Sequence, residues 1–488
     1  MPSNTQPLTS SPPVIPAATI RGQTWLAEEG HPQRPWILAV LASVAFMAQL
    51  DLFIVNIAIP AIGRSFGGAG LSNVSWVLNA YAIVFAALLV PAGRLADHFG
   101  RRRFLIAGVT IFTVASALCA LAPNLDVLVL GRIVQAVGAA IVVPTSLGLL
   151  LPSFPTRQHS FVVGVWAGVA AVAASSGPPV GGLLVAINWR WIFLINLPIG
   201  LAVVLVGLRV LPEIRAGINQ RLPDAFSVIA LLGAISLLIL ATVQGQSWGW
   251  ASDRTLGVFA VGALALGLTI YRTMHHPNAL IEASLFQSRE FTTAAVALFL
   301  FFVAFSVWLL ITVVFLQDVW HYSALRAGLA MTPGPITAAL FALNSGRITR
   351  RVGRAVPAIA GAFFVAASAG YWLSSVPSHS SYFGSFLPGL ILGGAGAGLA
   401  QAPLFAAAST LAPDRATTGS AVLNMSRQVG SAVGVALLVA LLASPHPTAL
   451  GLYHRGWIAE IVASLLAALA IVVLRLRRSP PRDSASGR

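Results

Sequence analysis

The hydrophobic positions of this chain form long, almost unbroken runs, whereas strands would show short runs or strict alternation. A helix needs roughly 20 apolar residues to cross a bilayer core of about 30 Å. Fourteen runs have about this length or more; they lie at residues 36–62, 76–97, 104–122, 127–150, 161–187, 191–211, 225–244, 255–273, 291–316, 326–346, 355–375, 383–411, 417–443 and 456–475. The pattern predicts an all-α polytopic membrane protein with fourteen transmembrane helices.

The polar segments between the runs carry most of the arginines, and they carry them unevenly. If both termini lie on the inner side, as an even number of spans requires, the inner segments hold twenty-two arginines and the outer segments hold five. Cytoplasmic loops of membrane proteins are enriched in basic residues. We therefore expect a multi-pass protein of a bacterial inner (cytoplasmic) membrane with both termini in the cytoplasm. All basic residues other than histidine are arginines, and the chain is rich in alanine and glycine; this composition suggests a bacterial genome of high GC content.

Composition excludes several classes of protein. Of the 488 residues, 57% are hydrophobic and 9% are charged, whereas soluble proteins carry about 25% charged residues. The 29 basic residues outnumber the 14 acidic ones but are spread over short gaps, so no nucleic-acid partner is expected. Cys119 is the single cysteine, the nine histidines lack metal-ligand spacing, and no lysine completes a phosphate-binding loop. We expect no metal and no organic cofactor.

A repeated motif divides the chain. Residues 93–103 (GRLADHFGRRR) follow the second run and residues 346–354 (GRITRRVGR) follow the tenth, with Arg350 in place of the acid Asp97. Internal repeats build many transporter folds. The copies lie eight runs apart, whereas two six-helix halves would place them six apart, so two helices are inserted between the halves.

The apolar runs and the repeated motif together predict that the chain has five parts. They are a disordered cytoplasmic tail at 1–34, a six-helix bundle at 35–211, two inserted helices with linkers at 212–290, a second six-helix bundle at 291–475 and a basic cytoplasmic tail at 476–488.

Two charged residues lie deep inside predicted spans. Asp51 is about fifteen residues into the first run, roughly 22 Å along a helix, and Arg132 lies in the fourth run with Gln135 one turn on. Buried charges in membrane helices usually face a cavity or a partner and mark ion or proton paths. We expect Asp51 to take part in proton coupling or to attract a cationic substrate. The structural alternative is that Asp51 only supports helix packing together with Asn56.

The fifth run contains small residues and two consecutive prolines, at Gly168, Gly177, Pro178, Gly181 and Gly182. Proline interrupts the helical hydrogen bonds and small residues allow helices to approach closely. We expect a kinked, tightly packed segment that gates one side of the protein.

Polar residues interrupt the thirteenth run at Asn424, Arg427 and Gln428. Together with Asn56 and Gln135, they are candidates for lining a substrate cavity. Glu460, near the outer start of the last run, is expected to extend toward the membrane surface rather than to serve transport.

These motifs resemble those of the major facilitator superfamily, in its fourteen-span drug:proton antiporter branch. The resemblance covers nearly the whole membrane region and rests on residues 50–60, 93–103, 132–140, 168 with 176–182, and 188–200. The arginine motif keeps Gln135 but has Ala136 where glycine is common. The resemblance implies two six-helix bundles plus two extra central helices, and a proton-coupling function for Arg132.

The resemblance also implies a cytoplasmic latch between neighbouring helices. Its residues would be Gly93, Asp97, Gly100, Arg101 and Arg102. The second copy of the motif lacks the acid, so its latch is expected to be weaker or absent.

The resulting prediction is a proton-coupled antiporter that exports small hydrophobic or cationic toxic compounds by alternating access, functional as a monomer in the lipid bilayer, with protons as the coupling ion. Two alternatives stay open. One is a transporter of the same fold for a single physiological solute. The other is a polytopic membrane transferase, which would need a carboxylate or histidine cluster near the interface; the few acids here are scattered.

Overall fold

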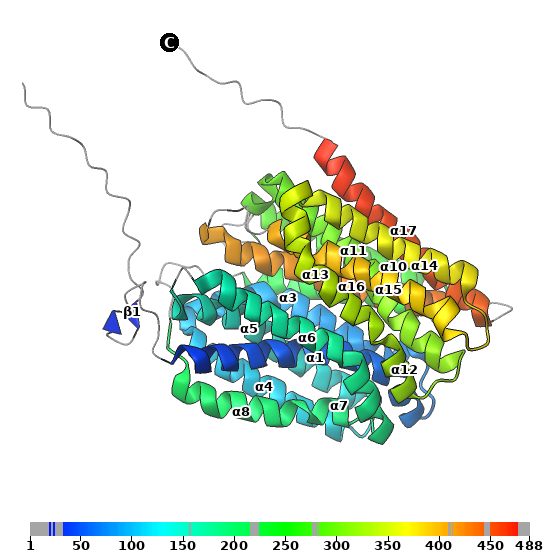
Figure 1. Ribbon diagram of the computed structural model, residues 1–488, viewed down its shortest axis with the longest axis horizontal. Helices are drawn as coiled ribbons and strands as arrows, with labels where there is room; N and C mark the ends of the chain where they lie inside the picture. Colours follow the sequence, from blue (N-terminus) through cyan, green and yellow to red (C-terminus); the bar gives the residue numbers. More distant parts are fainter. Residues whose placement is uncertain are drawn as a thin grey trace, which may run out of the picture.

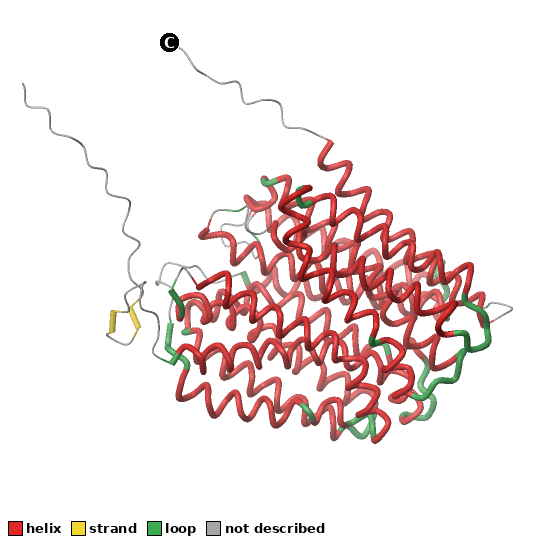
Figure 2. The backbone as a smooth tube through the Cα atoms, in the orientation of Figure 1, coloured by secondary structure: helices red, strands yellow, loops and turns green. Residues whose placement is uncertain are grey.

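The computed structural model describes residues 19–20, 23–24, 33–155, 158–214, 224–275, 281, 283–407, 411, 413–443 and 449–476. Within these residues nearly all regular structure is helical (Figure 2). The exception is a pair of antiparallel two-residue strands, β1 (Thr19–Ile20) and β2 (Gln23–Thr24). The predicted tails at 1–34 and 476–488 otherwise lie almost wholly outside the described residues.

The first half of the chain forms one bundle, drawn in blue to green in Figure 1. Its helices are α1 (Arg34–Ser65), α2 (Leu71–Val74), α3 (Trp76–Phe99), α4 (Arg101–Leu121), α5 (Leu125–Leu150), η1 (Leu151–Ser153), α6 (His159–Ile187), α7 (Trp191–Leu194) and α8 (Asn196–Val210). Gly100, at φ +112°, lets the chain turn sharply between α3 and α4. Asn124 caps α5 by accepting a hydrogen bond from the backbone N–H of Val127 at 2.9 Å. Within the bundle α1 packs on α6, and α5 packs on α3 and α4.

The second half forms a similar bundle, drawn in yellow-green to red. Its elements are η3 (Ala283–Gln287), α11 (Arg289–Asp318), α12 (Ala324–Met331), α13 (Pro333–Val352), α14 (Ala355–Ser375), the π-helical turn η4 (Tyr382–Phe386), α15 (Leu387–Phe405), α16 (Pro413–Leu442) and α17 (Ala449–Leu476). Helix α11 is the most buried span and packs on α16 and α17. The N-terminal end of α1 and the C-terminal end of α17 lie toward the same side of the molecule in Figure 1.

Two further helices, α9 (Ala225–Trp248) and α10 (Asp253–His275), lie between the halves in sequence. They pack on each other, and α9 also packs on α3 of the first half and α16 of the second. Little of α10 is buried in the protein. The inserted pair therefore borders both halves and exposes an apolar outer face to the bilayer.

All fourteen predicted runs fall on helices of the structure. Among the described residues, twelve helices are long and apolar enough to cross a membrane. The other two predicted spans fall on α6 and α13, so the count of fourteen stays a prediction. Helix α13 carries arginines in its last turn, at Arg350 and Arg351, which lower its apolar content.

Several predicted boundaries differ from the structure; helix α17, for example, begins at Ala449, seven residues before the predicted start at residue 456. The sixth run begins with the short α7 before α8 starts. The tenth run is divided into α12 and α13 near Thr332, because Pro333 has no backbone N–H to continue the helix. Helix α15 ends at Phe405, six residues before the predicted end at residue 411.

Candidate functional site

Asp51 and Arg132 form a buried ion pair. Asp51 lies near the middle of α1 and Arg132 lies two turns into α5. The Arg132 Nη1 donates to Asp51 Oδ2 at 2.6 Å, and the two side chains are 1% and 0% exposed. Each charge in this apolar bundle needs its partner, because a lone buried charge is strongly destabilising.

A polar cluster with residues from α4, α5 and α8 surrounds this pair. Gln135 accepts from Arg132 Nη1 at 2.6 Å and donates to Asp51 Oδ1 at 2.9 Å. The same amide donates to Ser116 Oγ of α4 at 2.8 Å. Asn196 of α8 also donates to Asp51 Oδ1, at 3.3 Å. Both oxygens of the carboxylate are therefore hydrogen-bonded, and Gln135, grouped with the cavity residues by sequence, lies in this cluster instead.

Helix α3 holds the other side of the guanidinium. The Nε of Arg132 donates to the carbonyl of Val77 at 3.0 Å, and its Cζ lies 4.0 Å from the centroid of the Tyr81 ring. If Asp51 bound a proton, Arg132 would keep these contacts and that to Gln135. Arg132 is thus a fixed cation held by several groups besides Asp51, since arginine does not deprotonate.

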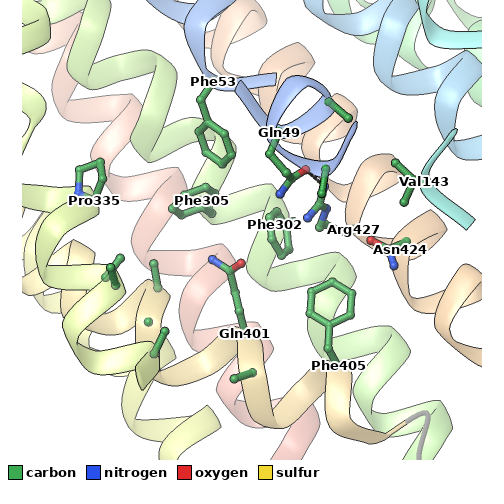
Figure 3. Close-up of a pocket in the computed structure, with 18 of the residues that line it drawn as sticks. Gln49, Phe53, Val143, Phe302, Phe305, Pro335, Gln401, Phe405, Asn424 and Arg427 are labelled. Atoms are coloured by element: carbon green, nitrogen blue, oxygen red, sulfur yellow. Dashed lines mark hydrogen bonds between the residues drawn. The ribbon is translucent and has the colours of Figure 1, made fainter. Parts of the chain in front are cut away.

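A cavity of about 510 Å³ lies between the two halves (Figure 3). Its wall is largely apolar and rich in aromatic rings, and its polar side chains come from few positions. Those labelled in Figure 3 are Gln49, Gln401, Asn424 and Arg427. The lining residues of α5, α15 and α16 lie toward the helix ends that the predicted topology places at the cytoplasm.

A smaller pocket of about 70 Å³ lies between this cavity and the ion pair. Asn56, Tyr81, Arg132, Arg427 and Gln428 are among its lining residues. Because Arg427 lines both spaces, it lies where the cavity approaches the ion-pair cluster.

The predicted cavity residues therefore divide between two spaces. Asn424 and Arg427 line the larger cavity, whereas Asn56 and Gln428 line the smaller pocket. The Asn56 amide donates to the carbonyl of Leu52 at 3.0 Å, a contact within its own helix.

The glycines of α6 allow two close helix contacts. A Cβ at Gly177 would lie 2.7 Å from Cβ of Phe53 in α1, and one at Gly181 would lie 3.2 Å from the carbonyl oxygen of Ile54. A Cβ at Gly182 would lie 2.7 Å from the carbonyl oxygen of Ala324 in α12. At Gly177 and Gly182 a Cβ would overlap the neighbouring helix, whereas at Gly181 it would make a tight contact.

The contact between α6 and α12 is reciprocal. A Cβ at Gly328 of α12 would lie 2.3 Å from the carbonyl oxygen of Pro178 in α6. This backbone contact joins the two halves at the predicted outer side. Gly168 also lies in α6, but its surroundings are outside the described side chains.

The predicted latch lies where α3 ends and α4 begins. The Nε of Arg101 pairs with Asp97 Oδ1 at 2.6 Å, and its Nη1 donates to the carbonyl of Gly148 at the end of α5. Arg102 donates to the carbonyl of Leu208 near the end of α8. These contacts join helices within the first half.

Gly93 and Gly100 complete the latch motif. A Cβ at Gly93 would lie in ordinary contact, 3.5 Å, with the Pro144 side chain of α5, and Gly100 makes the turn between α3 and α4. The second copy of the motif also has an ion pair, from Arg354 to Glu290 of α11 at 2.7 Å. That acid comes from another helix, which sequence spacing did not indicate.

Glu460 corrects one expectation. It does not extend to the membrane surface: the residue is 0% exposed, and both of its carboxyl oxygens lack a hydrogen-bond partner among the described residues. The hydroxyl of Ser464, one turn along α17, is also buried and unpartnered in that part of the chain.

Sequence reasoning missed several residues of the site. Asn196 donates to Asp51, Ser116 accepts from Gln135 beside the ion pair, and Gln49 accepts a hydrogen bond from Arg427. Each is a single uncharged polar residue in an apolar run, and many such residues in membrane helices bond only to their own backbone. Only the packing of the helices shows whether such a residue bonds to its own backbone or to a side chain of another helix.

The chain is similar in sequence to known proteins. The family described as Major Facilitator Superfamily matches residues 41–435. The chain is 33% identical over 402 residues to the Multidrug resistance protein Stp of Mycobacterium tuberculosis, covering 82% of this chain and 74% of that protein. It is 32% identical over 438 residues to the Tetracenomycin C resistance and export protein of Streptomyces glaucescens, covering 88% and 78%.

The fold is also similar to that of solved structures. A crystal structure of the POT family transporter PepTSo matches with a TM-score of 0.67 over 91% of this chain and 99% of that chain. The sequence identity is 16%, so this likeness concerns the fold alone.

Proposed function

The chain belongs to the Major Facilitator Superfamily and is therefore a membrane transporter rather than an enzyme, and we propose that it exports small, largely apolar toxic compounds in exchange for protons. The observation that carries the proposal is the buried Asp51–Arg132 pair beside a large aromatic cavity. Relatives named for multidrug resistance and for tetracenomycin C resistance and export support the direction of transport.

The cavity supports a drug-like substrate more than a single polar solute. Its wall offers many apolar and aromatic contacts and few polar groups. Such a surface holds apolar compounds through burial of their area, which depends little on their exact structure. A site for one polar solute would instead need several convergent hydrogen-bonding groups.

Proton coupling is assigned to Asp51. Protonation would remove the charge that attracts Arg132 and would weaken the 2.6 Å contact between α1 and α5. Arg132 would then rely on Gln135, on the Val77 carbonyl and on Tyr81. Because α1 and α5 also line the cavity, a shift between them would reach the substrate.

Alternating access would follow from a breakable contact between the two halves. In this conformation α6 is in backbone contact with α12 at the predicted outer side, and the cavity lies toward the predicted cytoplasmic side. We assign this arrangement to an inward-facing state. Opening outward would separate α6 from α12, and the two conformers need differ by only a few kcal/mol.

The assigned location is a bacterial cytoplasmic membrane with both termini inside. The excess of arginines in the predicted inner segments supports this orientation. Protons are the coupling ion, and a monomer contains the whole cavity and the ion pair.

The test is a resistance screen in a bacterial host that lacks its own efflux pumps. The wild-type gene is expected to raise resistance to a set of apolar compounds, and a protonophore is expected to abolish that resistance. Asp51→Asn should abolish it at equal expression, whereas Asp126→Asn, an exposed acid at the start of α5, should retain it. Resistance that survives the protonophore, or survives Asp51→Asn, would refute proton-driven export.

A further inference from the structure

Arg427 of α16 is the one charged residue among the described residues that line the large cavity. Its side chain contacts amides rather than acids: Nη2 donates to Gln49 Oε1 at 3.4 Å and Nε donates to Gln428 Oε1 at 3.3 Å. Figure 3 shows the Arg427 and Gln49 side chains beside each other on the cavity wall. Both hydrogen bonds are long, so they can be exchanged for stronger ones.

No acid neutralises Arg427 within the described part of the chain. Asp51, the acid of the neighbouring cluster, is already paired one-to-one with Arg132. The pair and Arg427 together therefore leave one net positive charge at the junction of the cavity and the smaller pocket. A cation in a low-dielectric wall is costly unless an anion or strong acceptors pair with it.

The surroundings of this charge are aromatic. The Arg427 Cζ lies 5.5 Å from the centroid of the Phe302 ring. Phe302 and Phe305 are 5.6 Å apart edge to face, and Trp308 stacks on Phe305 at 5.6 Å. These rings form a continuous wall on α11 that suits a planar apolar body.

We propose that the cavity selects compounds that join a planar aromatic body to an anionic group such as a carboxylate or phenolate. The anion accepts from the Arg427 guanidinium in place of the Gln49 amide, and the rings pack against Phe302, Phe305 and Trp308. A guanidinium binds a carboxylate bidentately, with stronger hydrogen bonds than a neutral amide makes. This assignment rests on the proposed export function and replaces the expectation of cationic substrates, which the positive wall would repel.

The test measures binding of three matched probes to the full chain in lipid nanodiscs. Pyrenebutyrate, pyrenebutanol and pyrenebutyltrimethylammonium share one ring system and differ in charge. Energy transfer from the protein's tryptophans to pyrene reports binding, since Trp166 and Trp308 line the cavity; the signal from empty nanodiscs is subtracted. We expect pyrenebutyrate to bind about tenfold more tightly than pyrenebutanol, and the cation most weakly.

Variants assign this preference to one side chain. Arg427→Gln should weaken pyrenebutyrate binding about tenfold and leave pyrenebutanol nearly unchanged, whereas Arg427→Lys should retain most of the preference. Arg254→Gln is the matched control, because Arg254 lies over the Trp248 ring at the α9–α10 turn, outside the cavity lining. Equal binding of the three probes by the wild type, tighter binding of the cation, or an anion preference that survives Arg427→Gln would each overturn the proposal.

Binding in nanodiscs needs no proton gradient, so this test separates the two claims. An anion preference without protonophore-sensitive resistance would refute export and leave the assignment of Arg427 standing. Protonophore-sensitive resistance without an anion preference would refute the assignment of Arg427 and leave proton-driven export standing.

Discussion

Replacing Gly328 by alanine should open the outer side of the protein. The new Cβ would lie 2.3 Å from the carbonyl oxygen of Pro178 and 3.1 Å from the Cα of Gly182. Contacts of this kind normally exceed 3 Å, so α6 and α12 would have to separate by about 1 Å. Both partners are backbone atoms, and no side chain can rotate away to relieve the overlap.

The cost is confined to the state in which α6 contacts α12. Overpacking of a well-packed contact costs about 1–3 kcal/mol. A value of about 2 kcal/mol would shift the equilibrium between the inward-facing and outward-facing states about thirtyfold toward the latter. Gly346→Ala is the matched control, since its Cβ would meet nothing within 4 Å on α13.

Distances between spin labels would measure this shift. Cys119, the one native cysteine, would be replaced by alanine, and labels would be attached to cysteines at Gly70 and Ser378. These exposed positions belong to different halves and flank the predicted outer side. Gly328→Ala should add a longer distance to the distribution, and Gly346→Ala should leave it unchanged. A folded Gly328→Ala protein with the wild-type distribution would refute the gating argument.

Three further substitutions test other parts of the structure. Asp97→Asn removes the partly exposed ion pair with Arg101, which is worth about 1 kcal/mol. It should slow transport in proteoliposomes several-fold with little change in melting temperature. An unchanged transport rate would contradict a latch function for this pair. Glu460→Leu should raise the melting temperature by about 2 °C and spare transport, because it removes buried oxygens that have no partner in the described part of the chain. A lower melting temperature would show that the carboxyl is needed. Asp224 caps α9 and pairs with Arg272 of α10 at 2.7 Å, so Asp224→Ala should destabilise the α9–α10 pair by about 1 kcal/mol. Hydrogen bonds from Ser227, and then the contact with Arg272, lower the Asp224 pKa from 3.8 to about 2. The difference in thermal stability between wild type and Asp224→Ala should therefore be constant above pH 4 and shrink as pH falls toward 2. A stability difference that grows as the pH falls would contradict this prediction.

The positions of the helices along the chain could be predicted from the sequence alone. Apolar runs are long because backbone groups in a bilayer must bond within their own helix, so hydropathy alone locates them. The division near Thr332 was missed, although Pro333 and Pro335 mark it, because a run of apolar residues continues across the break. Helix ends near loops depend on capping and on neighbouring helices, which hydropathy does not report.

The site was only partly predictable. Asp51 and Arg132 could be singled out because charges are rare in membrane helices, but their direct pairing across 81 positions needed the fold. Ser116 and Asn196 carry no signal that separates a member of the polar cluster around the ion pair from a locally bonded side chain. For Glu460, the rule that charged residues near helix ends reach toward water failed, because its side of α17 faces the bundle.

The central claim is that Asp51 couples proton movement to export. The most direct measurement uses purified protein in liposomes that contain a pH-sensitive dye, with a compound taken from the resistance screen. Wild type and Asp126→Asn should move protons when the compound is added, and an imposed pH gradient should drive its accumulation. Asp51→Asn should still exchange the compound across the membrane but move no protons. Accumulation driven by the pH gradient in Asp51→Asn, at the wild-type rate, would contradict the account.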